Sequence, residues 1–390
     1  MYLFALFLVL YEFTAYSAND MIMPGMLQVV QYFHVAEYYV AESLSFYILG
    51  NCAFILIAGF LAQKYGKRQI ILLGNFLFLL FTVIIIFSHN IHEFMLWRFL
   101  QGVGLAIIAI GYALIHENFN DRDAIKLIAL MANISLLAPL LGPAIGSVIM
   151  IFLSWQYVFV LTALIGLLSI IGLYRYIPKD HSQKSSLGFF EAMKEYGLII
   201  KNKAFIKGVF CSGFMIMPVL IWISQAPNLI LYKLKLDYTH YIIYQLISIG
   251  GLTASSILMQ FIVGKYRLYS VVKTGILFML TGLLIILVNP NNITNIAVAL
   301  FFYALGMGLA NGCVYRLIMT IEGYSNSMLS SMIGFLQMLF FVVGIAVINE
   351  FMNYYKFALW SFTLTLCLFG FAALVFITKY ISFYRNRDWR

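Results

Sequence analysis

The chain has 390 residues, of which 63% are hydrophobic and only 10% are charged, and its formal net charge is +9. Soluble domains carry about 25% charged residues, so the composition excludes a water-soluble globular protein and makes lipid the solvent for much of the surface. The sequence contains no H-x-x-E-H, G-x-S-x-G or phosphate-loop motif. We therefore expect a membrane protein that is not an enzyme and needs neither a metal nor a cofactor.

Twelve apolar runs of about 20 residues follow one another, and each is long enough to cross a bilayer as an α-helix. The longest polar stretch, 178–203, separates the sixth run from the seventh. The sequence thus predicts an all-α membrane protein with a six-helix bundle over 1–178, a cytoplasmic linker over 179–203 and a second six-helix bundle over 204–390. The expected spans are 3–31, 42–62, 69–88, 92–116, 126–152, 156–177, 205–231, 241–263, 270–288, 294–319, 328–350 and 357–380.

Basic residues are concentrated in the loops after even-numbered spans. These loops and the C-terminal tail hold 19 of the 24 lysines and arginines, whereas the loops after odd-numbered spans hold 3. This is the positive-inside pattern, and it predicts a multi-pass protein of the cytoplasmic (inner) membrane with both termini in the cytoplasm. Topology accounts for the positive charge, so no nucleic-acid partner is implied.

Short matches between the halves predict an internal repeat. Gly102–Ala106 in the fourth span matches Gly306–Ala310 in the tenth at an offset of 204 residues. A second match, between the segments after spans two and eight, has an offset of 201 residues. Duplicated six-helix halves are typical of transporters whose substrate site lies between the halves, near the midplane of the bilayer.

Two carboxylates, Glu12 and Asp20, lie inside the first expected span. A charge at bilayer depth costs roughly 2.5–3.5 kcal/mol, so two acids in one helix indicate a function. Eight residues apart, they differ by about 80° around the helix and about 12 Å along it, so both can face one cavity. A poorly hydrated cavity disfavours the charged form, which predicts proton uptake that releases a cationic ligand. A snorkelling or structurally paired acid is the alternative.

Two arginines also lie within expected spans. Arg98 in the fourth span is a permanent cation, so we expect a carboxylate or carbonyl partner, with Glu12 or Asp20 as the obvious candidate. The alternative places Arg98 at the outer interface, where its side chain reaches water. Arg316 lies nearer the cytoplasmic end of the tenth span, where snorkelling is equally plausible.

The turn after the second span is a candidate for conformational control. It contains Gly59, Gln63, Gly66 and Arg68. A tight turn with basic residues can hold carboxylates or helix ends across a bundle and stabilise one conformation. The simpler interpretation is that its charges only set the topology.

The fifth span combines two prolines with two glycines. Pro139 and Pro143 remove backbone donors, and Gly142 and Gly146 permit close contact between helices. The pattern predicts a cavity wall or a hinge. An ordinary kinked helix is the alternative.

These segments together resemble the drug/proton antiporters of the major facilitator superfamily, over nearly the whole chain. The acid pair of the first span is the most specific part of the resemblance. The matching segments are Leu10–Phe13, Asn19–Met26, Arg98–Gly102, Ala129–Asn133, Ala138–Gly146, Gly308–Asn311 with Arg316, and Leu336–Leu339.

The resemblance implies a monomer that exports lipophilic drugs or related small molecules in exchange for protons, by alternating access. Proton handling falls to Glu12 and Asp20, with Arg98 in support. The residues expected to line or support the substrate cavity are Tyr16, Asn19, Asp20, Asn133 and Arg316.

One departure from the family pattern is Gln63, which stands where the family usually has an aspartate. The charge relay of that loop is therefore incomplete, and a dedicated proton-coupled carrier of one metabolite or siderophore is the alternative. A channel or membrane enzyme is a third class. The missing catalytic motifs disfavour an enzyme, and two unequal halves with one acid pair suit alternating access better than the continuous pore of a channel.

Overall fold

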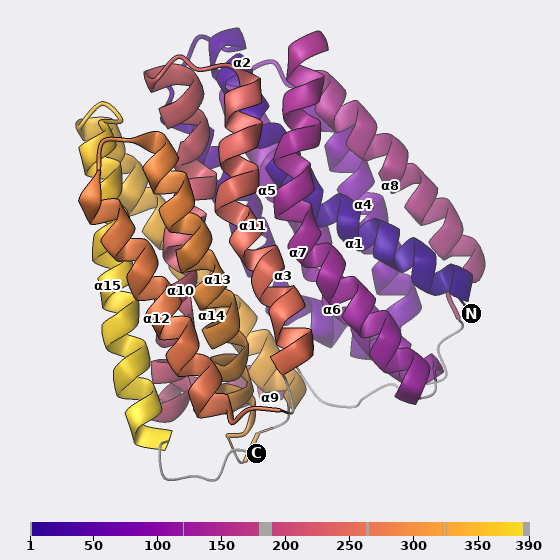
Figure 1. Ribbon diagram of the computed structural model, residues 1–390. Helices are drawn as coiled ribbons and strands as arrows, with labels where there is room; N and C mark the ends of the chain where they lie inside the picture. The colour runs from indigo at the N-terminus through magenta and orange to yellow at the C-terminus, as the bar shows by residue number, and fades with distance from the viewer. Residues whose placement is uncertain are drawn as a thin grey trace. The chain divides into compact units, whose positions relative to one another are not determined.

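The computed structural model describes residues 2–119, 121–178, 189–262, 265–321, 323–324 and 326–384, and the side chains of Gln63 and Asn133 lie outside the described part. Every secondary-structure element within these ranges is a helix (Figure 1). By length and composition, ten of the described helices can cross a membrane. The predicted all-α membrane fold is therefore confirmed.

Contacts divide the chain into two compact units, Met1–Glu195 and Tyr196–Arg390. The division falls within α9 (Phe189–Lys201), inside the segment expected to link the bundles. The first unit contains α1 (Tyr2–Ile22), η1 (Met23–Gly25), α2 (Met26–Tyr32), α3 (Tyr39–Tyr65), α4 (Lys67–Ile86), α5 (Ile91–Ala106), α6 (Ile108–Asn118), α7 (Asp121–Phe152) and α8 (Gln156–Tyr176). The second contains α10 (Lys203–Pro227), η2 (Asn228–Lys233), α11 (Tyr238–Ile262), α12 (Leu268–Val288), α13 (Ile293–Met319), α14 (Asn326–Tyr354) and α15 (Leu359–Tyr384).

Twelve long helical segments are present in the described chain when α5 and α6 are taken as one span. Ten of them are the apolar helices counted above. The other two are α1 and α7. The first carries Glu12, Asn19 and Asp20 among its apolar residues, and the apolar segment described for the second is shorter, Leu137–Phe152.

Three expected spans are interrupted. The first helix ends at Ile22, and the 3-10 turn η1 follows because Pro24 has no N–H to continue the helical ladder. The fourth span is divided at Ile107, whose N–H bonds to the carbonyl oxygen of Gly104 at 3.3 Å, as in a 3-10 turn. The seventh passes after Pro227 into η2, a π-helical turn.

The two units use the same order of helix neighbours. In the first, α1 packs on α7 and α8, α5 packs on α3 and α4, and α4 packs on α8. In the second, α10 packs on α14 and α15, α13 packs on α11 and α12, and α12 packs on α15. A duplicated six-helix plan predicts this correspondence.

Glycines set the closest helix contacts in the first unit. A Cβ atom on Gly50 of α3 would overlap the carbonyl oxygen of Phe99 on α5, and one on Gly102 of α5 would overlap that of Tyr47 on α3. Each glycine therefore lets the backbone of the neighbouring helix approach. The two helices could not keep this distance with any larger residue at either position.

The second unit repeats one half of this arrangement. A Cβ atom on Gly251 of α11 would overlap the carbonyl oxygen of Phe301 on α13, just as one on Gly50 would overlap that of Phe99. Gly306, however, faces Gly275 of α12, whereas Gly102 faces α3. The sequence match between Gly102 and Gly306 thus joins two glycines with different packing partners.

Gly66 connects α3 to α4 with φ +102° and ψ 139°, a conformation that L-residues rarely adopt. We expect Gly66→Ala to lower the free energy of unfolding by ~1–3 kcal/mol, since the alanine Cβ is strained there. Gly59→Ala is the control, because no atom lies within 4 Å of a Cβ at Gly59. Thermal unfolding in detergent measures both, and equal midpoints for the two variants would contradict the prediction.

Candidate functional site

The candidate site is built on α1, which supplies both buried acids. Glu12 is fully buried and Asp20 is 7% exposed. Because they differ in angle around the helix, they meet different neighbours. Glu12 bonds to Tyr112 of α6, whereas Asp20 lies beside Gly142 of α7.

Arg98 of α5 is completely buried, so the interfacial alternative is wrong. Its Nε donates to Ser43 Oγ at 3.2 Å, its Nη1 to Gln101 Oε1 at 2.6 Å and its Nη2 to Asn19 Oδ1 at 2.6 Å. The guanidinium carbon also lies 4.6 Å from the centre of the Tyr47 ring. Three uncharged acceptors and an aromatic face therefore stabilise this cation.

Asp20 reaches Arg98 through Asn19. The Nδ2 of Asn19 donates to Asp20 Oδ1 at 3.2 Å while its Oδ1 accepts from Arg98. Among the described residues, no carboxylate forms an ion pair with Arg98, so the expected direct partner is replaced by an amide. Asn19 precedes Asp20 by one residue, or about 100° around α1, and it occupies the position that faces the guanidinium.

The Arg98 cluster extends to a fourth helix and back to α1. Gln101 Nε2 donates to Thr82 Oγ1 at 2.8 Å, and Thr82 Oγ1 donates to a carbonyl of its own helix α4. The hydroxyl of Tyr47 on α3 donates to the carbonyl oxygen of Ala15 on α1 at 2.6 Å. Helices α1, α3, α4 and α5 are thus joined by one buried polar network around a single cation.

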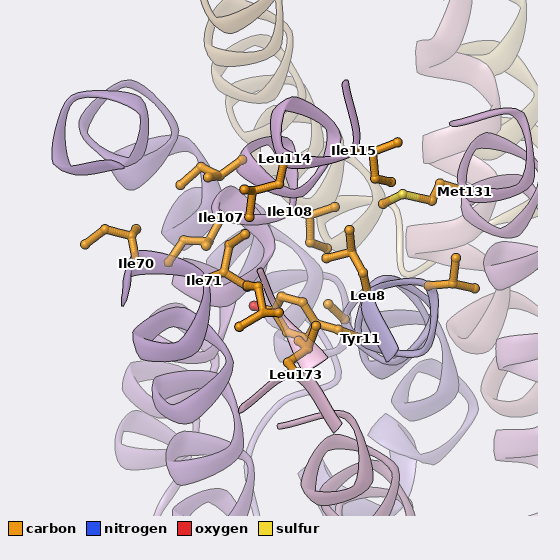
Figure 2. Close-up of a cluster of buried hydrophobic side chains, with 14 of the residues drawn as sticks. Leu8, Tyr11, Ile70, Ile71, Ile107, Ile108, Leu114, Ile115, Met131 and Leu173 are labelled. Atoms are coloured by element: carbon orange, nitrogen blue, oxygen red, sulfur yellow. The ribbon is translucent and has the colours of Figure 1, made fainter. Parts of the chain in front are cut away.

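A buried hydrophobic cluster lies beside Glu12. Tyr112 Oη donates to Glu12 Oε1 at 2.8 Å. Residues beside this bond on both helices, including Leu8 of α1 and Ile108 and Ile115 of α6, belong to a buried hydrophobic cluster (Figure 2). An anion is costly in such surroundings, so a proton on Glu12 would remove a buried charge.

The glycines of α7 fit against α1 at Asp20. A Cβ atom on Gly142 would lie 2.9 Å from the Cβ atom of Asp20, and one on Gly146 would overlap the carbonyl oxygen of Met21. Pro139 and Pro143 lie in the same helix, which is continuous through both. The proline–glycine segment is therefore the part of α7 that packs on the acid of α1.

Of the residues of the predicted turn, only Gly66 lies between helices, since Gly59 and Gln63 belong to α3 and Arg68 belongs to α4. The Nη2 of Arg68 donates to the carbonyl oxygen of Tyr174 at 3.2 Å, near the C-terminal end of α8, where a cation is favourable. Gly59 has open space beside it. Gly66 provides the left-handed backbone described above, and the side chain of Gln63 lies outside the described residues.

The other predicted substrate contacts are Tyr16, Arg316 and Asn133. Tyr16 is half-buried on α1 and packs on the hydrophobic cluster of Figure 2. Arg316 is exposed in the last turn of α13, in the second unit. Asn133 belongs to α7, but its side chain is outside the described part. Their roles stay predictions.

Sequence reasoning missed Ser43, Tyr47, Thr82 and Tyr112. Each is a single polar residue in an apolar helix, and such residues usually bond within their own helix or pack in the core. The signal available was the buried arginine, which requires several acceptors. Which helices supply them depends on packing that one sequence does not show.

Comparison with known proteins agrees with this architecture. The family model described as Major Facilitator Superfamily matches residues 8–348. The chain belongs to the major facilitator superfamily. As a member of this transporter family, it is a multi-pass membrane carrier and not an enzyme.

Named relatives in this superfamily are similar over most of the chain. The Multidrug transporter MdfA of Escherichia coli O157:H7 is 36% identical over 351 residues, which cover 88% of this chain and 86% of that protein. The Chloramphenicol resistance protein CraA of Acinetobacter baumannii is 33% identical over 393 residues, covering 100% of this chain and 94% of that protein. The solved D-xylose-proton symporter shares the fold, with a TM-score of 0.74, 15% identity, and coverage of 97% of this chain and 98% of that one.

Proposed function

We propose that this carrier exports lipophilic drugs and related small molecules across the inner membrane in exchange for protons. The similarity to relatives named for multidrug transport and chloramphenicol resistance supports this choice of cargo. The observation that carries the proposal is the presence of two buried acids, Glu12 and Asp20, on one helix. Helix packing does not require buried acids, because burying a charge is costly.

Asp20 is the acid through which the proton acts on the Arg98 cluster. As an anion it accepts from Asn19, which in turn accepts from Arg98. A proton on Asp20 would remove its negative charge and weaken the hydrogen bond from Asn19. Cargo that is held by the Asp20 charge would then be released.

Glu12 provides a second protonation site in a separate place. Its Oε1 accepts a hydrogen bond from the hydroxyl of Tyr112 on α6. Protonation would remove the negative charge of this carboxylate. We assign it to proton passage along α1, and we assign Tyr16, Asn19, Asp20, Asn133 and Arg316 to the cargo.

The transport cycle alternates between the two sides of the membrane in a monomer with cytoplasmic termini. Its moving bodies are the six-helix bundles over 1–178 and 204–390, joined by the cytoplasmic linker over 179–203. We assign conformational control to two segments. The first is the α3–α4 corner with Gly59, Gln63, Gly66 and Arg68, and the second is Pro139, Gly142, Pro143 and Gly146 of α7. A dedicated carrier of one metabolite or siderophore is less well supported, since the relatives are named for multidrug transport and chloramphenicol resistance.

The test is transport in proteoliposomes under an imposed pH gradient. It compares the wild type with Glu12→Gln and Asp20→Asn, using chloramphenicol as a neutral cargo and tetraphenylphosphonium as a cationic cargo. We expect at least one replacement to abolish gradient-driven accumulation while binding of the neutral compound persists, since only the protonation site is lost.

The matched controls replace exposed acids by the same amides. Glu93→Gln in the first turn of α5 and Asp237→Asn before α11 both change side chains that contact solvent. These controls should transport like the wild type. If both Glu12→Gln and Asp20→Asn still concentrate cargo with the pH gradient, the assigned proton roles are wrong.

A further inference from the structure

A second polar cluster lies in the other unit, and the proton cycle does not use it. Ser212 of α10 is fully buried and donates to Asn311 Oδ1 of α13, and Gln337 Nε2 of α14 donates to Ser212 Oγ at 2.7 Å. These three helices pack against one another (Figure 1). One hydroxyl therefore orients two amides from two neighbouring helices.

Hydrogen-bonding capacity is left over in this cluster. The Nδ2 atom of Asn311 carries two N–H groups that can donate, and the Oε1 atom of Gln337 can accept. Neither atom has a hydrogen-bond partner among the described residues. Both side chains are only half-buried. The cluster thus presents a donor and an acceptor that a bound molecule can reach.

A sealed polar cluster in the same unit shows the contrast. Trp222 Nε1 donates to Gln245 Oε1 at 2.8 Å, and Gln225 Nε2 donates to Asn349 Oδ1 at 3.5 Å. All four of these side chains are fully or almost fully buried. They hold α10 to α11 and α14 and, being buried, present no amide that a bound molecule can reach.

The accessible cluster is uncharged. The one charged residue in the last turn of α13 is Arg316, which is exposed and five residues beyond Asn311. Amide and hydroxyl groups without a charge favour a neutral group that both donates and accepts, such as a hydroxyl or an amide. They offer little to a cation without hydrogen-bonding atoms.

We propose that Asn311 and Gln337 form a binding site for the hydroxyl or amide groups of neutral cargo, with Ser212 as the residue that positions them. The inference rests on the proposed export function and specifies its cargo. Neutral hydrogen-bonding compounds use this site in the second unit, whereas cations depend on the acids of the first.

The experiment measures KM and kcat for Asn311→Leu and Gln337→Leu in proteoliposomes under a pH gradient. Chloramphenicol, which has hydroxyl groups and an amide, is compared with tetraphenylphosphonium, which has no hydrogen-bonding atom. A lost hydrogen bond of ordinary strength predicts a rise of about five- to tenfold in KM for chloramphenicol. KM for the cation should change less than about twofold, and kcat should stay unchanged for both compounds.

Ser212 and an unrelated hydroxyl provide the further variants. Ser212→Ala should raise KM for chloramphenicol alone, and Ser212→Thr should restore it because the hydroxyl is kept. Thr281→Val is the control, since its exposed hydroxyl bonds to a carbonyl of its own helix. This variant should match the wild type for both compounds.

Three results would overturn the inference. An equal rise in KM for both compounds would show that the cluster only supports packing, and unchanged KM values would show that cargo does not contact it. A wild-type protein that concentrates neither compound would reject the export function and this site together. If the wild type transports normally and the Asn311→Leu and Gln337→Leu variants have its KM values, the site is rejected and the export function stands.

Discussion

Arg98→Lys should lower the transport rate of every cargo about 100-fold, even though the positive charge is conserved. The guanidinium donates in three directions, to Ser43, Gln101 and Asn19. A lysine ammonium concentrates its donors on one atom and cannot reproduce this planar fork. Each hydrogen bond to a charged group contributes about 1.5–3 kcal/mol, so the loss of two of them at the lower figure, about 3 kcal/mol, accounts for about two orders of magnitude.

The measurement is the initial rate of gradient-driven uptake at equal amounts of reconstituted protein. Arg175→Lys is the matched control, because Arg175 is exposed in the last turn of α8 and bonds none of the buried groups. Size-exclusion chromatography in detergent shows whether each variant is folded. A folded Arg98→Lys protein with more than a third of the wild-type rate would contradict the role assigned to the Arg98 guanidinium.

Gly146→Ala should destabilise the first unit by ~3 kcal/mol and abolish coupled transport. The new Cβ atom would overlap the carbonyl oxygen of Met21, a backbone atom that cannot rotate away. Helices α1 and α7 must then separate, and overpacking of this kind costs about 1–3 kcal/mol. The shift falls next to Asp20, so proton handling should fail together with stability.

The thermal midpoint in detergent and gradient-driven uptake should both be measured for this variant. Gly166→Ala on α8 is the control, because its Cβ would lie at an ordinary 3.7 Å from Leu79 Cδ1. We expect the control to unfold and transport like the wild type. Equal midpoints for Gly146→Ala and Gly166→Ala would show that α1 and α7 do not need this close approach.

The membrane fold could be predicted because apolar length and charge asymmetry act along the chain. Runs of about 20 apolar residues have few alternatives to a spanning helix. The local breaks were harder to foresee. Pro24 gave a visible signal for the end of α1, but the change at Ile107 has no proline, and apolar periodicity does not show it.

The candidate site could be predicted only in part. Glu12, Asp20 and Arg98 are conspicuous because charged residues are costly in apolar helices. Their partners depend on helix rotation, which decided that Asn19 and not Asp20 contacts Arg98. Tyr112 could not have been paired with Glu12 from the sequence, since 100 residues separate them and tyrosines are common in this chain.

The neutral partners of Arg98 have an electrical consequence. Ser43, Gln101 and Asn19 contribute no charge, so the cluster is electroneutral with an ionised Asp20 and a monovalent cation with a protonated one. One hydrogen ion on Asp20 therefore makes the cluster sensitive to voltage. A single elementary charge moved through a 100 mV membrane potential gains or loses about 2.3 kcal/mol. A negative cell interior would therefore attract the cluster inward when Asp20 is protonated.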